Sequence, residues 1–236
     1  VEAHDDGSRT VRLASDEHLE DIGVVPLPPY IHKSLTDPDR YQTVYSRETG
    51  SAAAPTAGLH FTPELIDRIR DMGVETAFVT LHVGWATFRS VETDDVTKHD
   101  IHSEYFVLGK EAAETINRAK SEGRRIVTIG TTAVRLLENA ASFNGEQRPV
   151  DPETVEGRST QDNVVIAGSG WADIFIYPGY EFRIVDTLVT NFHLPKSTLL
   201  MLISAFADRD LVFQAYQEAI NHGYSFYTFG DAMLVV

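Results

Sequence analysis

The chain has 236 residues, contains no cysteine and carries a formal net charge of −15. The lack of cysteine excludes disulfides, thiolate nucleophiles and cysteine metal sites, and it is typical of a cytoplasmic protein. A hydrophobic content of 42% is enough for the core of one large domain or two small ones. No apolar run reaches the roughly 18 residues of a membrane span.

The N-terminal part of the chain predicts a hairpin followed by a stiff linker. Asp5-Asp6-Gly7-Ser8 is a turn sequence, with weakly alternating residues on either side of it, at 1–4 and 10–13. The proline-rich residues 26–30 then favour an extended, rigid segment.

From Pro63 onward, helix and strand patterns alternate. A helix over 63–72 has Thr62 as its N-cap and proline at its first position. A strand over 76–83 is almost continuously apolar, as in a buried parallel sheet. Further helices are predicted over 110–122, 133–141, 197–207 and 210–221, further strands over 125–129, 174–177, 187–190 and 225–229, and a polar surface loop over 143–163.

This alternation predicts an α/β fold with a largely parallel sheet, in which functional groups gather where strands end. The richest such stretch runs from Thr190 to Met201. An apolar strand stops at Thr190-Asn191-Phe192-His193, a proline turn follows, and Lys196-Ser197-Thr198 opens a helix. The layout can present backbone N–H groups and polar side chains to an anionic ligand. An ordinary surface loop is the alternative.

Three similar stretches occur: a small-residue loop at 50–61, a strand end with histidine, glycine and aromatics at 81–88, and a second strand–turn–helix at 129–138. Four more blocks complete the pattern: Pro26-Leu27-Pro28-Pro29-Tyr30-Ile31, Arg40-Tyr41-Gln42-Thr43-Val44-Tyr45, Tyr177-Pro178-Gly179-Tyr180 and Phe229-Gly230-Asp231-Ala232-Met233-Leu234. In this order, from about Pro26 to Val236, the blocks resemble the S-adenosylmethionine:tRNA ribosyltransferase-isomerase family of queuosine biosynthesis.

The resemblance implies an α/β fold with two parts. Residues 24–236 are expected to form an incomplete (β/α) barrel-like main catalytic domain with mostly parallel strands. Residues 1–23 are expected to be the tail of a small inserted β-barrel domain. Family members normally carry a further stretch before the equivalent of Val1, so the chain is expected to be either a truncated member or a naturally short one.

The resemblance also implies a reaction. S-adenosylmethionine is the co-substrate, with no permanently bound cofactor. Its ribosyl moiety passes to 7-aminomethyl-7-deazaguanine (preQ1) in a tRNA with a GUN anticodon and is isomerised, giving epoxyqueuosine, adenine and methionine. A monomer or weak oligomer in the cytoplasm, away from membranes, is expected. Two alternatives stay open: a relative that cleaves S-adenosylmethionine or transfers its ribosyl part to a free small molecule, and a nucleotide-binding module without activity.

Deprotonation next to a sulfonium asks for a proton-transferring group of near-neutral pKa, most naturally histidine. His60 and His193 lie in ligand-type loops and are predicted to be catalytic, with His102 and Glu104 next in line. For His60 and His193, a structural hydrogen-bonding role is an equal alternative. The segment 99–104 is weak evidence for a metal site, and no metal is expected.

The predicted substrate-binding residues are Thr56, Gly58, His82, Thr87, Thr131, Thr132, Arg135, Tyr177, Thr190, Asn191, Lys196, Ser197, Thr198 and Asp231. Thr131 and Thr132 precede a helix and suit the methionine carboxylate, with simple capping as the alternative. Arg135 and Glu138 are one helical turn apart and can pair with each other. The candidates for stacking on adenine or deazaguanine are Trp85, Phe88, Tyr177, Phe192 and Tyr227.

The net charge and one substitution are unusual for a tRNA-binding enzyme. Phosphate binding needs lysine and arginine, so a local basic strip on an acidic body is expected. The residues that can form this strip are Lys33, Arg40, Arg47 and Lys196. The chain has Ser225 where the family usually has arginine, which removes a cation and keeps the small-molecule alternative open.

Overall fold

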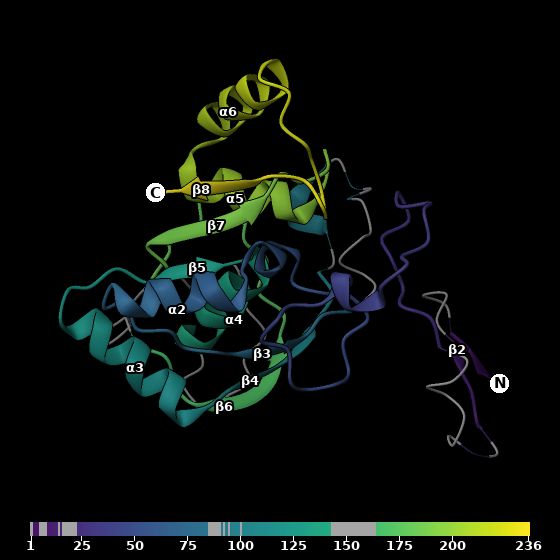
Figure 1. The fold of residues 1–236 in the computed structure, drawn as a ribbon, viewed down its shortest axis with the longest axis horizontal. Coiled ribbons are helices and arrows are strands. Elements are labelled where there is room, and N and C mark those ends of the chain that lie inside the picture. The colour runs from purple at the N-terminus through teal and green to yellow at the C-terminus, as the bar shows by residue number, and fades with distance from the viewer. Residues whose placement is uncertain are drawn as a thin grey trace.

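The computed structural model describes residues 2–4, 9–13, 15, 23–84, 91, 93, 95–99, 101–142 and 164–236. Two three-stranded sheets form the framework (Figure 1). The first has the order β3 (Thr80–His82), β4 (Glu104–Leu108), β6 (Gly168–Ala172). The second has the order β5 (Val127–Ile129), β7 (Thr187–Asn191), β8 (Ala232–Val235). The fold is therefore mixed α/β, as the sequence predicts.

The prediction of mostly parallel strands is wrong. Among the described strands, β5 and β7 form the one parallel pair, while β3–β4, β4–β6 and β7–β8 are antiparallel. The strand predicted over 76–83 pairs only at Thr80–His82, where it is half-buried, and Phe78 just before it is exposed. Its apolar run therefore does not reflect a strand covered on both faces, which is the pattern of a parallel sheet.

All five predicted helices are confirmed to within about two residues at each end. They are α2 (Pro63–Asp71), α3 (Lys110–Ser121), α4 (Thr131–Ser142), α5 (Thr198–Ala207) and α6 (Arg209–Asn221). Their starts follow the expected capping chemistry, since Thr62 Oγ1 accepts from Leu65 N at 3.2 Å and Ser197 Oγ accepts from Leu200 N at 3.2 Å. Short 3-10 turns occupy η1 (Pro38–Tyr41), η2 (Thr56–His60) and η4 (Val96–Lys98).

Two predicted strands are wrong, and their neighbours form the ladders instead. Residues 174–177 are not a strand; Ile176 there is buried in the core, and β6 lies just before it. Residues 225–229 form a closed turn, because Tyr227 has a positive φ of 72° and the Asp231 carboxylate accepts from Ser225 N at 2.7 Å. The paired strand that follows is β8. Strand β4 was not predicted at all.

The core lies around α4, which contacts β5 and β7 of one sheet and β3 and β6 of the other. Its apolar face is fully covered, with Val134 and Leu136 at 0% exposure. Glu138 on the same helix is also at 0% exposure. Its carboxylate accepts hydrogen bonds at 3.0 Å from the N–H groups of residues 183, 184 and 185 and from the Tyr180 hydroxyl. Glu138 therefore anchors the segment that leads into β7.

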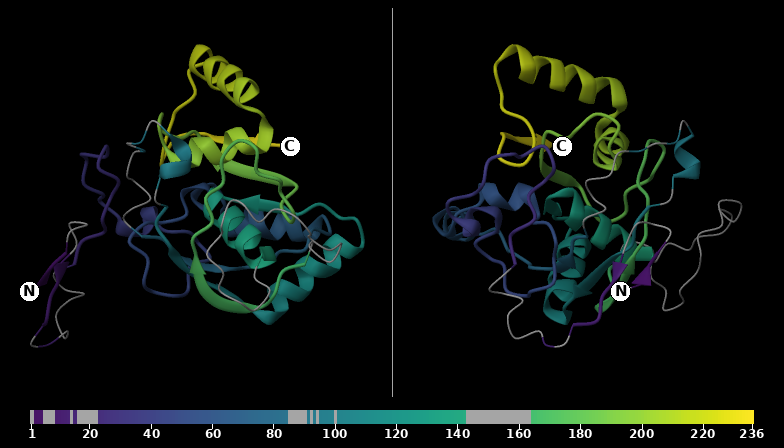
Figure 2. Two further views of the ribbon diagram at one scale, coloured as in Figure 1. Left: turned by 180° about the vertical axis from the view of Figure 1, so that it is seen from behind. Right: turned by 90° about the vertical axis from the view of Figure 1, so that its right-hand side faces the viewer.

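The hairpin expected near the N-terminus is present as β1 (Glu2–Ala3) and β2 (Arg9–Thr10), paired antiparallel. Figures 1 and 2 show it projecting away from the body of the protein. The division into residues 1–23 and 24–236 stays a prediction. In the described part of the chain, no helix is both long and apolar enough to cross a membrane.

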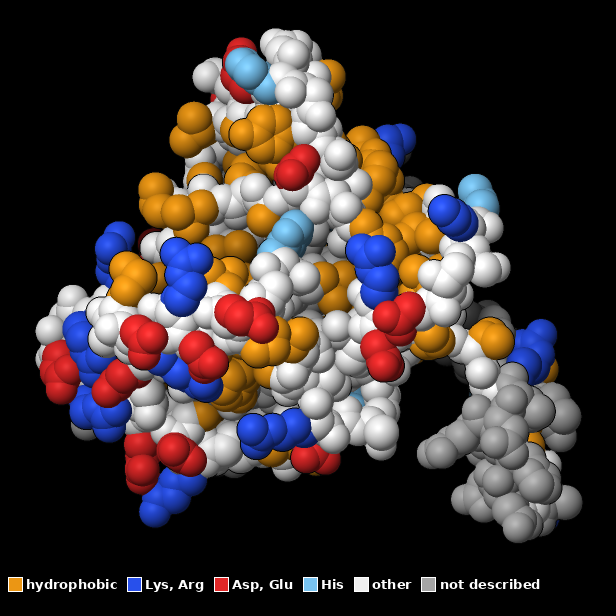
Figure 3. All heavy atoms as spheres, in the orientation of Figure 1, with side chains coloured by type: hydrophobic (Ala, Val, Ile, Leu, Met, Phe, Trp, Pro, Cys, Tyr) orange, Lys and Arg blue, Asp and Glu red, His pale blue; other side chains and the backbone are white. Residues whose placement is uncertain are grey.

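α6 lies at the top of the molecule in Figure 1 and stands clear of the sheets in both views of Figure 2. Figure 3 shows apolar side chains uncovered over α6 and β8, whereas charged side chains gather over α2 and α3. The uncovered apolar residues in this region are Leu211, Phe213, Ile220 and Leu234.

Candidate functional site

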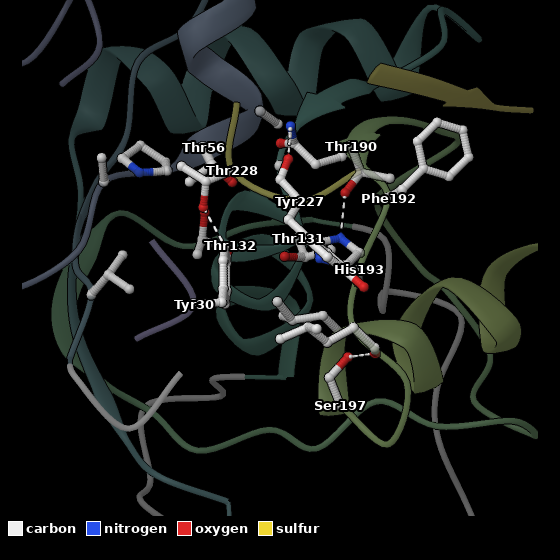
Figure 4. Close-up of a pocket in the computed structure, with 18 residues that line it drawn as sticks. Tyr30, Thr56, Thr131, Thr132, Thr190, Phe192, His193, Ser197, Tyr227 and Thr228 are labelled. Atoms are coloured by element: carbon white, nitrogen blue, oxygen red, sulfur yellow. Dashed lines mark hydrogen bonds between the residues drawn. The ribbon is translucent and has the colours of Figure 1, made fainter. Parts of the chain in front are cut away.

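The pocket lies where the parallel strands β5 and β7 end, and it encloses about 820 Å³ of empty space including its open mouth (Figure 4). The sequence-predicted residues that line it are Thr56, Thr131, Thr132, Thr190, Asn191, His193 and Ser197. They come from three separate segments, so the fold brings together polar residues that the sequence identified one stretch at a time.

At the end of β7, Thr190 and Asn191 are almost completely buried, at 0% and 2% exposure. Asn191 Nδ2 lies 3.1 Å from the Tyr227 carbonyl oxygen and 3.1 Å from His60 Nε2. A carbonyl only accepts, which fixes the amide NH2 toward these two partners. His60 Nε2 is therefore the acceptor, and the neutral ring carries its proton on Nδ1. His60 itself does not line the pocket.

His193 follows directly and does line the pocket. Its Nε2 lies 2.8 Å from Thr190 Oγ1, and its backbone N–H donates to the Tyr216 hydroxyl at 2.8 Å. Desolvation lowers the pKa of His193 to about 4. The imidazole is therefore neutral near pH 7 and can accept a proton or a hydrogen bond. Phe192 beside it stacks on Phe226 with ring centroids 4.7 Å apart, which holds the turn in place.

Two helix N-termini open into the same pocket. α4 begins at Thr131, directly after Gly130, whose φ of 92° makes the sharp turn from β5 into the helix. α5 begins at Thr198 with Ser197 as its cap. The first-turn N–H groups of a helix lack intrahelical partners and carry partial positive charge. The pocket therefore offers two sets of donors to a carboxylate or another anion.

Glu104 and Arg135 were predicted to act on substrate, but neither lines the pocket. Both are buried and form an ion pair, with Arg135 Nη1 2.6 Å from Glu104 Oε2. Arg135 also donates to the carbonyls of His102 at 3.1 Å, Ala172 at 3.3 Å and Ile174 at 3.2 Å. Arg135 thus joins α4 to β4 and β6, and it pairs with Glu104 rather than with Glu138.

Burial and pairing act in opposite directions on this ion pair. Desolvation raises the pKa of Glu104 and lowers the pKa of Arg135, while the charge of each partner counteracts both shifts. The 2.6 Å contact is that of a charge-assisted hydrogen bond between ionised groups. The arrangement supports a structural role for these two residues.

Four other predicted residues also lie outside the pocket. His82 packs against Tyr105, with ring centroids 5.9 Å apart, and His102 is exposed. Tyr177 packs against Phe175, with centroids 5.2 Å apart. The Asp231 carboxylate closes the turn around Tyr227 by its bond to Ser225 N.

The remaining predicted residues are Gly58, Lys196, Thr198 and Thr87. A side chain at Gly58 would collide with the Tyr45 hydroxyl, so close packing accounts for this glycine. Lys196 is exposed, with a positive φ of 56°, and Thr198 is the first residue of α5. Thr87 lies outside the described residues, as do Trp85, Phe88 and the loop predicted over 143–163.

Sequence reasoning missed part of the pocket wall. Tyr30, Gly130 and Thr228 line the pocket and were not predicted as site residues. Tyr227, considered only as one of several stacking candidates, lines it too. Tyr30 belongs to the Pro26–Ile31 block and Thr228 directly precedes the Phe229 block. Their positions in or beside these blocks were the signal that could have identified them as site residues.

The half-buried His193, whose pKa is lowered by desolvation, should make stability fall in mild acid. Its pKa is about 4 in the fold and 6.5 ordinarily. As pH falls from 6.5 to 4, the unfolded chain binds a proton that the folded protein refuses, and unfolding becomes easier. The full difference corresponds to about 3 kcal/mol, and the effect should be smaller because the residue is only half-buried. Urea unfolding at pH 7.5 and 4.5 should show a smaller pH-induced loss for His193→Gln than for the wild type. Equal losses in both proteins would contradict the shift.

Comparison with known proteins identifies the family of the chain. A family model described as queuosine biosynthesis protein matches residues 1–235. The chain is 53% identical over 235 residues to the S-adenosylmethionine:tRNA ribosyltransferase-isomerase of Desulfitobacterium hafniense, covering 98% of this chain and 64% of the relative. It is 52% identical to the corresponding protein of Natranaerobius thermophilus, covering 98% of this chain and 63% of the relative.

A solved structure agrees as well. The crystal structure of S-adenosylmethionine tRNA ribosyltransferase from Thermotoga maritima matches with a TM-score of 0.56 and 40% sequence identity, over 77% of this chain and 51% of that one. The chain thus spans less than two thirds of the length of the relatives it matches. The match of the family model along residues 1–235, together with identities of about half, shows that the chain belongs to the queuosine biosynthesis protein family.

Proposed function

We propose that the chain transfers and isomerises the ribosyl moiety of S-adenosylmethionine onto preQ1 in tRNA, releasing adenine and methionine. The relatives it matches along almost its whole length carry the name of this activity. The observation that supports the proposal most is the pocket at the ends of β5 and β7. It combines a neutral imidazole, buried amide and hydroxyl groups, and two helix N-termini.

The polar ends of the pocket suit the methionine part of S-adenosylmethionine. Its carboxylate would bind at a helix N-terminus, at Thr131 and Thr132 or at Ser197, where N–H donors and the helix dipole favour an anion. Asn191 Oδ1 is buried and has no hydrogen-bond partner in the described part of the chain. Leaving such an acceptor unpaired costs about 1–3 kcal/mol, so an N–H or O–H group of the ligand is expected to satisfy it.

His193 is the best-placed group for proton transfer. The reaction needs a base that removes a C5′ proton next to the sulfonium, and a neutral imidazole at the pocket wall can do so. An imidazole with a pKa of about 4 is a weak base, so the step depends on the acidity that the sulfonium gives to the C5′ hydrogens. Thr190 orients the ring through its contact with Nε2. His60 would contribute indirectly, because its hydrogen bond to Asn191 would hold that side chain in position.

The acceptor is proposed to be tRNA, held by the basic strip of Lys33, Arg40, Arg47 and Lys196. All four residues are exposed. Arg40 Cζ lies 6.0 Å from the centre of the Phe229 ring, two residues beyond the pocket residue Tyr227. This places one cation of the strip beside the turn that borders the site. The proposal includes a monomer or weak oligomer in the cytoplasm, the compartment where tRNA is modified.

Reversing two charges of the strip should abolish tRNA binding. The variant Arg40→Glu/Arg47→Glu should lose salt-sensitive binding of preQ1-bearing tRNA in a filter assay, because each phosphate contact releases counterions. Its affinity for S-adenosylmethionine should stay as in the wild type. The control Arg68→Glu/Lys110→Glu makes the same change in net charge on α2 and α3 and should bind tRNA nearly normally. Equal losses in both variants would mean that net charge alone is responsible.

Adenine release from S-adenosylmethionine, followed by chromatography, tests the proposed function. Release should require preQ1-bearing tRNA and should be absent with tRNA that lacks the modified base. Release with the free base or with water alone would instead favour the small-molecule relative. If S-adenosylmethionine binds but no adenine is released under any of these conditions, the remaining interpretation is a nucleotide-binding module without activity. The test should be repeated after exhaustive chelation, since no metal is expected to be needed.

A further inference from the structure

Two tyrosines from opposite ends of the chain form an aromatic corner in the pocket wall. Tyr30 comes from the segment after the N-terminal hairpin and Tyr227 from the turn before β8. Their ring centroids are 5.3 Å apart with an interplanar angle of 49°. A planar ligand cannot slide between them, because a sandwich needs about 7 Å between the outer rings, twice a stacking distance. The corner can therefore receive a flat group only on an open face.

Tyr227 is held in an unusual conformation. Its φ of 72° lies in the left-handed region, which glycine adopts freely and tyrosine rarely does. Three hydrogen bonds keep it there: its N–H donates to the Phe192 carbonyl at 3.0 Å, and its own carbonyl accepts from Asn191 Nδ2 and from Gly230 N, both at 3.1 Å. Such conformations persist where the surroundings enforce them, and they cluster at ligand clamps.

The Tyr227 ring packs edge-on against Phe226, with ring centroids 6.1 Å apart, but it is not buried in the core. The residue is half-buried, and within the described residues its hydroxyl makes no hydrogen bond. A glycine would satisfy the backbone without strain, so the site keeps a large aromatic ring where the backbone does not favour one.

The Tyr30 side chain is held in place beside Tyr227. The Tyr30 hydroxyl lies 2.7 Å from Oγ1 of Thr228, which is buried and directly follows Tyr227 (Figure 4). Burial raises the pKa of Tyr30, so the phenol stays protonated at neutral pH. This bond ties the two rings to the same turn and keeps the corner rigid.

We propose that Tyr227, supported by Tyr30, is the platform on which the adenine base of S-adenosylmethionine stacks. The inference rests on the proposed function. The helix N-termini of α4 and α5 suit the carboxylate at the other end of that molecule, which leaves the aromatic corner for its one large flat group. A rigid aromatic face recognises a heteroaromatic base through stacking, largely independently of hydrogen bonds.

The test compares two ligands, S-adenosylmethionine and S-adenosylhomocysteine, by calorimetry. Both carry adenine, but only the first carries the sulfonium charge. The variants Tyr227→Gly and Tyr227→Asn remove the ring while suiting the left-handed backbone. They should weaken binding of both ligands about 10- to 100-fold, the usual effect of losing one stacked base. Tyr227→Phe, which keeps the ring, should bind both within about threefold of the wild type.

The control is Tyr224→Asn, directly before the same turn, since Tyr224 is 51% exposed and does not line the pocket. It should bind both ligands as the wild type does. The proposal is overturned if the folded Tyr227→Gly protein keeps wild-type affinity, or if affinity falls for S-adenosylmethionine alone, which would place the ring against the sulfonium. A wild-type protein that binds neither ligand would instead refute the proposed function.

Discussion

Replacing His193 with alanine should lower the rate of adenine release at least about 100-fold, the typical contribution of a positioned acid or base. The pocket contains this ring, while His60 does not line the pocket and lies behind Asn191. His60→Ala should therefore reduce the rate less than His193→Ala does. Single-turnover measurements with saturating S-adenosylmethionine would separate loss of chemistry from loss of binding.

The two histidine variants also control for each other. Each should keep a thermal midpoint close to that of the wild type at pH 7.5. A folded His193→Ala protein with near-normal turnover, beside a much slower His60→Ala protein, would move the proton transfer to His60. If both proteins kept normal turnover, neither histidine would be the base, and the base would have to be sought among other residues.

The largest loss of stability should follow from breaking the buried ion pair. Arg135→Met leaves the Glu104 carboxylate buried without its partner and should lower the free energy of unfolding by about 3–5 kcal/mol. The double variant Glu104→Met/Arg135→Met removes both charges and should regain part of this loss. Recovery should be incomplete, because three carbonyls also lose their Arg135 donor. Urea unfolding of Arg135→Met, Glu104→Met and the double variant measures the coupling.

The same residues test whether Glu104 is catalytic, as the sequence suggested. Glu104→Gln keeps the shape of the side chain but removes its charge. If the role is structural, adenine release per folded molecule should stay near that of the wild type while stability falls. A stable Glu104→Gln protein that has lost turnover would contradict the structural role and restore Glu104 to the chemistry.

The local parts of the fold could be predicted from sequence, because their signals are local. Thr62 was predicted as an N-cap, and its cap bond to Leu65 N is present; the helix predicted from Ser197 begins one residue later, with Ser197 as its cap. Strand direction could not be predicted in this way. Strand β4 pairs antiparallel with β3 and β6, which lie far from it in sequence, and no short pattern records those partners. The assumption that alternating elements imply a parallel sheet supplied the wrong direction.

The candidate site, like the fold, could be predicted from sequence only in part. Polar residues at strand–helix junctions, such as Thr131, Thr190 and Asn191, do line the pocket. The roles of charged residues were harder to predict. The sequence does not distinguish a glutamate and an arginine that bind substrate from a glutamate and an arginine that pair with each other. The positive φ of Tyr227 and its contact with Tyr30, almost 200 residues away, depend on tertiary packing and leave no mark in the sequence.

A crystal structure of the protein with bound S-adenosylhomocysteine tests the central claim most directly, that S-adenosylmethionine binds where β5 and β7 end. The account predicts ligand density in the pocket, with the carboxylate at the N-terminus of α4 or α5 and His193 facing the ribose. Density at another place, for example in the shallow hollow lined by Tyr45, Arg70 and Phe78, with this pocket empty, would contradict it.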